Sequence, residues 1–169
     1  MPRSFDMAAE YDGSVEQVYR AFSDERYWLA RLAGSGADKT TLDVMDVTVE
    51  TGVDVVTTQT LHADRLPGVV TQFHHGDLHF VREETWSPIV DGRANAIVKG
   101  SVPGAPAALT GTAVLTPVGS GGARLEFRAT VEVRIPLVGG KVENFIGNQL
   151  VELLIAEQRF TTDWLRDNP

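Results

Sequence analysis

The chain has 169 residues, of which 43% are apolar and 22% are charged, a composition typical of a globular protein with a sizeable core. Its length suits one domain and is short for two, so we expect a single domain over residues 1–169. The formal net charge of −8 argues against binding to nucleic acid and against electrostatic docking on an anionic membrane. Both kinds of binding need a surplus of lysine and arginine.

The sequence contains no cysteine, which excludes disulfides, thiolate zinc sites and thiol nucleophiles. Its N-terminal residues lack the unbroken apolar run of a signal peptide. No window approaches the roughly 18 consecutive apolar residues of a membrane-spanning helix. We therefore expect a cytoplasmic protein with no stable membrane insertion.

The N-terminal part of the chain predicts one strand followed by two short helices. Residues 3–11 alternate between apolar and polar side chains, as in a half-buried strand. Ser14 is a good N-cap, and Gln17 completes a capping box for a helix over residues 15–23. Asp24 caps a second helix that ends at a glycine-rich segment and carries an apolar group of residues, Tyr27, Trp28, Leu29 and Leu32.

From residue 39 onward the pattern changes to strands separated by turn residues. We expect strands at 39–49, 53–63, 78–87, 93–102, 107–117 and 123–134. The short connections between them make successive strands antiparallel neighbours. The last strand alternates strictly between apolar and mostly charged residues, so one of its faces meets the core and the other meets water.

A long amphipathic helix is expected over residues 141–166. Pro136 ends the preceding strand, and a broad apolar stripe follows the helix, formed by Val142, Phe145, Ile146, Leu150, Leu153, Ala156, Phe160 and Trp164. A sheet of seven antiparallel strands needs its apolar face covered, and only this helix is long enough to cover it. Because one helix contacts only part of a strongly curved sheet, we expect the remaining concave surface to form a mostly apolar cavity.

This order of elements resembles that of the START and birch-pollen-allergen (SRPBCC) superfamily, which includes the polyketide cyclases. The segments that carry the resemblance are the opening strand, residues 14–24 with Trp28 after them, Trp86 at the end of a strand, and residues 135–143 leading into the last helix. The chain also resembles an uncharacterised actinobacterial branch of that superfamily. The resemblance implies an α+β helix-grip fold, in which a curved seven-stranded antiparallel sheet, two short helices and a long C-terminal helix enclose a cavity. The superfamily contains lipid carriers, hormone receptors and cyclases, so the fold does not define the ligand.

Three of the four histidines lie in the segment 74–79. In a strand, His75, Asp77 and His79 would share one face, and two imidazoles with one carboxylate can bind a divalent metal. However, Gly76 permits a turn that would separate these side chains, and neighbours on one flat strand converge poorly on a single ion. We therefore expect a polar rim near the cavity mouth, with no metal site and no cofactor.

Residues 66–73 interrupt the series of strands. Their apolar side chains are spaced for one or two helical turns, at Leu66, Val69, Val70 and Phe73. Apolar loops of this length often cover a pocket, so we favour a lid over the cavity. The alternative is a plug that packs permanently on the sheet.

The strand at 78–87 places two charges among apolar residues. Arg82 and Glu84 share parity with Phe80 and Trp86, so if the aromatic side chains face inward, the charged ones do so as well and must pair inside the cavity. Such a pair could anchor a ligand carboxylate or hydroxyl. A bulge between Phe80 and Trp86 would instead place both charges in water. The sequence leaves both arrangements open.

The sequence shows no nucleophile elbow, phosphate loop or dinucleotide fingerprint, so we assign no catalytic residue. We expect the protein to bind or transport a hydrophobic, lipid-like or polyketide-like small molecule in its cavity. One alternative is a cyclase, dehydratase or hydrolase acting on a similar molecule, with Arg82, Glu84 or His79 in proton transfer. Another is an interaction module whose cavity is filled by its own side chains. The sequence does not define the oligomeric state.

The ligand-binding residues that we expect come from the second helix, from the inner face of the sheet, from the segment 66–73 and from the last helix. They are Trp28, Leu32, Val55, Thr57, Gln59, Val69, Phe73, Phe80, Arg82, Glu84, Val98, Phe145, Ile146, Gln149 and Leu153.

Overall fold

The computed structural model describes residues 2–72 and 74–169, and its elements follow the predicted order. The strands are β1 (Arg3–Tyr11), β2 (Lys39–Thr48), β3 (Gly52–Leu61), β4 (Leu78–Trp86), β5 (Ala94–Ser101), β6 (Ala107–Val118) and β7 (Gly122–Val133). The helices are α1 (Val15–Phe22), α2 (Glu25–Ala33), the short 3-10 helix η1 (Ala63–Arg65), α3 (Gly68–Thr71) and α4 (Gly139–Asp167). The predicted bounds are confirmed to within two residues, because Gly, Pro and Asp mark the ends of most elements.

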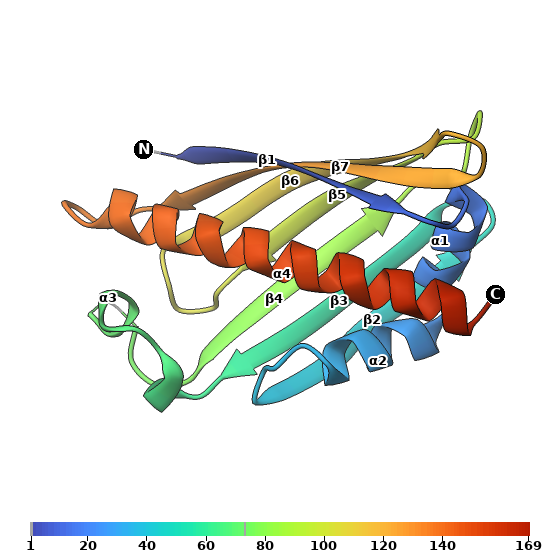
Figure 1. Ribbon diagram of the computed structural model, residues 1–169. Helices are drawn as coiled ribbons and strands as arrows, with labels where there is room; N and C mark the ends of the chain where they lie inside the picture. The colour runs from blue at the N-terminus through green and yellow to red at the C-terminus, as the bar shows by residue number, and fades with distance from the viewer. Residues whose placement is uncertain (1, 73) are drawn as a thin grey trace.

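The strands form one antiparallel sheet in the order β1-β7-β6-β5-β4-β3-β2, so the predicted fold class is confirmed. The sheet is open, with β1 and β2 at its edges. Figure 1 shows α4 crossing one face of this sheet, with α1 and α2 near the end of α4 that carries the C-terminus and α3 near the other end. Burial alternates along the inner strands, as in β5, where Ala94, Ala96 and Val98 are buried and the residues between them are exposed.

Caps and aromatic packing fix the two short helices against the end of the sheet. The predicted capping box of α1 is confirmed, since Gln17 N donates to Ser14 Oγ at 3.1 Å and Ser14 N donates to Gln17 Oε1 at 2.8 Å. In α2, the Trp28 indole N–H donates to the Phe22 carbonyl at 2.8 Å. The rings of Phe22 and Trp86 lie 5.1 Å apart, so the aromatic side chains of both helices join the core of the sheet.

Two contacts set the position of the N-terminal half of α4. Glu143 is fully buried, and its Oε2 accepts a hydrogen bond from Val133 N at 2.8 Å. The strand β1 pairs with β7 only as far as the partners Arg3 and Val131, so the Glu143 carboxyl takes the place of a strand partner at the end of β7. Farther along the helix, Gly147 lies directly against the Phe5 ring of β1. None of the described helices combines the length and the hydropathy of a membrane-spanning segment.

The close contact at Gly147 yields a prediction. A Cβ at this position would overlap the Phe5 ring, so Gly147→Ala should push α4 away from β1. Overpacking of this kind costs about 1–3 kcal/mol, which a urea denaturation curve measures as a lower unfolding free energy. Gly140→Ala in the same helix is the control, because its Cβ would meet only the Arg3 Nη2 atom at 3.5 Å. An equal loss in both variants would show that α4 does not need the close approach.

Candidate ligand-binding site

In the part of the chain that the structure describes, two cavities lie between the sheet and α4. The larger one, of about 540 Å³, lies under the N-terminal half of α4 and reaches the loops at residues 35–37, 65–67 and 102–105. The smaller one, of about 240 Å³, lies under the C-terminal half and reaches β1, α1 and α2. Three apolar side chains line both cavities, namely Phe80, Leu109 and Leu150. The larger volume falls within the range of about 300–1,000 Å³ that small-molecule sites occupy.

The larger cavity has mostly apolar walls with a few polar groups. Gln59 of β3 and Gln149 of α4 contribute side-chain amides that make no hydrogen bond to the residues that the structure describes. The charge of Arg65 at the cavity edge is matched, because its Nη1 donates to Asp38 Oδ1 at 3.0 Å and to the Gly36 carbonyl at 2.9 Å. This arrangement offers hydrogen bonds to a ligand but leaves no unmatched charge on this wall.

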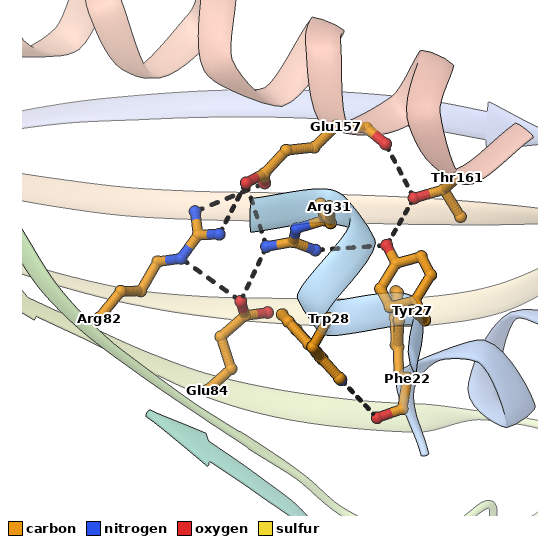
Figure 2. Close-up of polar contacts among 8 residues, drawn as sticks. All are labelled: Phe22, Tyr27, Trp28, Arg31, Arg82, Glu84, Glu157 and Thr161. Carbon is orange, nitrogen blue, oxygen red and sulfur yellow. Dashed lines mark hydrogen bonds and ion pairs between the residues drawn. The ribbon is translucent and has the colours of Figure 1, made fainter. Parts of the chain in front are cut away.

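Four charged side chains from three elements meet at the smaller cavity (Figure 2). Arg82 Nη2 lies 2.7 Å and Arg31 Nη2 lies 3.0 Å from Glu157 Oε2. Glu84 Oε2 lies 3.3 Å from Arg31 Nη2 and 3.4 Å from Arg82 Nε. Two positive and two negative charges therefore balance one another, and they connect α2, β4 and α4. We call these four residues the ion cluster.

Aromatic side chains of α2 support the ion cluster. The Arg31 guanidinium lies 4.4 Å from the centre of the Trp28 ring, within the range of a cation–π interaction. It also donates to the Tyr27 hydroxyl at 3.3 Å, and this hydroxyl shares a hydrogen bond of 2.6 Å with Thr161 Oγ1 of α4 (Figure 2). Each member of the ion cluster thus has its orientation fixed by more than one neighbour.

The ion pairs within the cluster favour the charged forms of Glu157 and Arg31. Burial raises the pKa of Glu157, but the guanidinium groups of Arg31 and Arg82 lower it by more, so the pKa lies below its usual range. Burial lowers the pKa of Arg31, but Glu157, Tyr27 and Glu84 together more than offset this effect, so the pKa of Arg31 lies above its usual value. At neutral pH, Glu157 therefore holds no proton that it could transfer.

The structure shows which face of β4 carries the side chains of Arg82 and Glu84. Its pairing with β3 is regular from Val53 and Trp86 to Leu61 and Leu78, so β4 has no bulge, and Arg82 and Glu84 both face inward. Other residues expected at the site also line a cavity. Phe80 and Val98 line the smaller one, and those that line the larger one are Gln59, Phe80, Phe145, Ile146, Gln149 and Leu153.

Some of the expected residues line neither cavity. Trp28 is covered by Arg31, and the other side chains that are buried away from the cavities are Leu32, Val55 and Thr57. Val69 packs against the core, while its neighbour Val70 lines the larger cavity, because consecutive residues in a helical turn point about 100° apart. Phe73 lies outside the described residues.

The histidine segment does not converge on one point. Gly76 adopts a φ of +85° before β4 begins, which separates His75 and Asp77 from the strand. Asp77 Oδ1 accepts a hydrogen bond from Ala63 N at 3.0 Å, and His79 Nδ1 shares one of 2.8 Å with Thr60 Oγ1. Within residues 2–72 and 74–169, no group of three potential ligands is placed to hold a metal ion. His79 lines neither cavity, whereas all four members of the ion cluster line the smaller one.

Sequence reasoning missed Arg31 and Glu157. Both residues interrupt an apolar face of a helix, and this was the signal that could have identified them. Arg31 follows Tyr27 and Trp28 at a spacing of four and three residues, and Glu157 follows Leu153 at a spacing of four. A charge on such a face must find a partner when the face is buried.

The ion cluster yields a second prediction. In Glu157→Gln, both arginines lose their shared carboxylate, and breaking a buried pair in this way costs about 3–5 kcal/mol of unfolding free energy. Asp163→Asn is the control on the same helix, because Asp163 forms only an exposed pair with Arg166 and should contribute about 1 kcal/mol at most. Chemical denaturation at neutral pH checks both values.

The pH dependence provides a further test of the same substitution. A carboxylate whose pKa is lowered on folding stabilises the protein above its ordinary pKa of 4.5, and this stabilisation is lost as the pH falls through the lower, folded value. The difference in stability between the wild type and Glu157→Gln should therefore shrink below about pH 4.5. A difference that stays constant down to the acid transition would contradict a charged Glu157.

Comparison with solved structures confirms the fold. The Zhui aromatase/cyclase from Streptomyces aligns with a TM-score of 0.64 at 7% identity, covering 98% of this chain and 94% of that one. Norcoclaurine synthase from Thalictrum flavum aligns with a TM-score of 0.60 at 14% identity, covering 99% and 88%. Norcoclaurine synthase is also known in complex with dopamine and hydroxybenzaldehyde. At such low identity these likenesses show the shared helix-grip fold of the superfamily that the sequence resembles.

Sequence comparison identifies much closer relatives. Uncharacterized proteins of Mycobacterium tuberculosis strain H37Rv and of Mycobacterium bovis are each 51% identical to this chain over 173 residues, covering 99% of both sequences. A family model matches residues 6–165, which is nearly the whole chain. The chain therefore belongs to the family described as "Protein of unknown function (DUF2505)".

Proposed function

We propose that the protein reversibly binds a neutral, mostly apolar small molecule in the larger cavity. The observation that carries the proposal is the space of about 540 Å³ that carbon-rich walls from the sheet and α4 line. Burial of apolar ligand surface in such a space contributes about 25 cal/mol of favourable free energy per Å². A lipid-like or polyketide-like molecule of moderate size matches this chemistry.

The polar groups of the cavity favour a neutral ligand with few polar atoms. The amides of Gln59 and Gln149 are available to a hydroxyl or carbonyl oxygen, and each such bond fixes the orientation of a bound molecule. A charged ligand group would have no free counter-charge, because Arg65 already pairs with Asp38 and the members of the ion cluster pair with one another.

Binding accounts for the site better than proton transfer does. The enzyme alternative relies on Arg82, Glu84 or His79, but Arg82 and Glu84 are held in mutual ion pairs and His79 lies away from both cavities. We therefore expect a bound molecule to be recovered chemically unchanged, which mass spectrometry of the released ligand measures.

A neutral fluorescent probe, N-phenyl-1-naphthylamine, tests the proposal. One probe molecule should bind per chain, and saturation should raise the melting temperature, because a ligand that binds only the folded state stabilises it by mass action. In Ile146→Trp, the indole should occupy the larger cavity and abolish probe binding while the chain remains folded. Leu29→Trp, on the exposed surface of α2, is the control and should bind the probe like the wild type.

The outcome that would overturn the proposal is equally definite. If the wild type binds no probe, or if Ile146→Trp binds it as tightly as Leu29→Trp does, the larger cavity is not a binding site for neutral apolar molecules.

The segment at the edge of the larger cavity also carries a prediction. We propose that residues 66–70 act as a lid, since Leu66, Pro67 and Val70 line the cavity from outside the sheet. Val70→Ala should then speed dissociation of the probe by more than it weakens the fold, because a lid residue controls exit. Stopped-flow displacement measures this rate. Loss of stability with an unchanged dissociation rate would indicate a permanent plug.

A further inference from the structure

A wall of three apolar side chains separates the two cavities. Phe80 of β4, Leu109 of β6 and Leu150 of α4 each line both spaces. Along β4, the residues before and after Phe80 line different cavities. Leu78 of β4 lines only the larger cavity, whereas Arg82, two residues beyond Phe80, lines only the smaller one.

The position of the Phe80 ring depends on a glycine in the neighbouring strand. A Cβ on Gly100 of β5 would lie 2.7 Å from Phe80 Cε1 and 2.9 Å from Cζ, so the ring occupies the space that a side chain would fill. The same point lies 3.3 Å from Leu109 Cβ, which places the ring next to Leu109. The absence of a side chain at residue 100 thus allows Phe80 to extend over β5 and complete the wall.

The wall also separates two kinds of chemistry. On one side, the larger cavity has the uncharged polar groups Gln59 and Gln149. On the other side, the smaller cavity contains the ion cluster. Apolar ligand atoms in the smaller cavity would remove the remaining contact of the ion cluster with water, and this desolvation is unfavourable. Both the ring and this cost disfavour a ligand that reaches from the larger cavity into the smaller one.

We propose that Phe80 sets the upper size limit of the ligand, which occupies the larger cavity alone and ends at the Phe80 ring. The inference rests on the proposed function and specifies the class of ligand. This class comprises compact neutral amphiphiles whose apolar part fits the larger cavity, and it excludes long chains that would have to pass Phe80.

Linear 1-alkanols of increasing chain length test the proposal by displacement of N-phenyl-1-naphthylamine. In the wild type, each added methylene should tighten binding about fourfold, equivalent to about 0.8 kcal/mol, until the chain fills the cavity and the gain stops. In Phe80→Ala the two cavities become one, so the gain should continue to longer chains. Phe80→Leu, which keeps part of the wall, should move the limit by a smaller amount.

Two further variants make the test decisive. Leu109→Ala opens the same wall from β6 and should also move the limit to longer chains. Leu32→Ala removes a buried side chain that lines neither cavity, so it controls for general loosening and should keep the wild-type limit.

The results separate this inference from the proposed function. If the wild type binds the naphthylamine probe but shows no chain-length limit, or if the limit is the same in the wild type, Phe80→Ala and Leu109→Ala, the role of Phe80 is overturned while the binding site stands. If the wild type binds neither the probe nor any alkanol, the proposed function fails and the size limit fails with it.

Discussion

The balance of charge in the ion cluster is the constraint on which the arrangement of this protein depends. Arg31, Arg82, Glu84 and Glu157 come from α2, β4 and α4, and removing any one of them leaves a largely buried charge with fewer partners. Their mutual contacts hold the C-terminal half of α4 at a fixed height above the sheet. Beneath the N-terminal half of the helix, whose position Glu143 and Gly147 set, the apolar side chains do not fill the space.

Two glycines help to determine the shape of the interior, because each lets an aromatic ring occupy the place of a side chain. Gly147 brings α4 into contact with Phe5 at one edge of the sheet, so the helix lies close to β1 there and the larger cavity lies toward the other strands. Gly100 makes room for the Phe80 ring, which lines both cavities. Packing at their borders therefore defines the two cavities, and these voids reduce the stability that a filled core would provide.

The sequence predicted the order and extent of the elements because each of them carries its own local signal. The alternation along β7, the capping box at Ser14 and the apolar stripe of α4 all depend on residues close together in the chain. The site depended on contacts between distant residues. The inward orientation of Arg82 could not be decided until the absence of a bulge was known, and Glu157 lies 75 residues away from it. Gly76 correctly predicted that the histidine side chains would lie apart, because a turn at a glycine is a local property of the sequence.

The hydrogen bond between Glu143 and Val133 has a consequence for how sequences of this family can vary in length. Glu143 anchors the first turns of α4 to β7, and Glu157, close to four helical turns later, anchors the same helix to the ion cluster. One inserted or deleted residue between these anchors would rotate one of them by about 100° relative to the other, and a buried carboxylate would lose its partners. The alignment with the mycobacterial relatives spans 173 residues, more than the 169 of this chain, so insertions or deletions separate the sequences. Natural selection should have confined them to the turns between strands and removed them from residues 143–157.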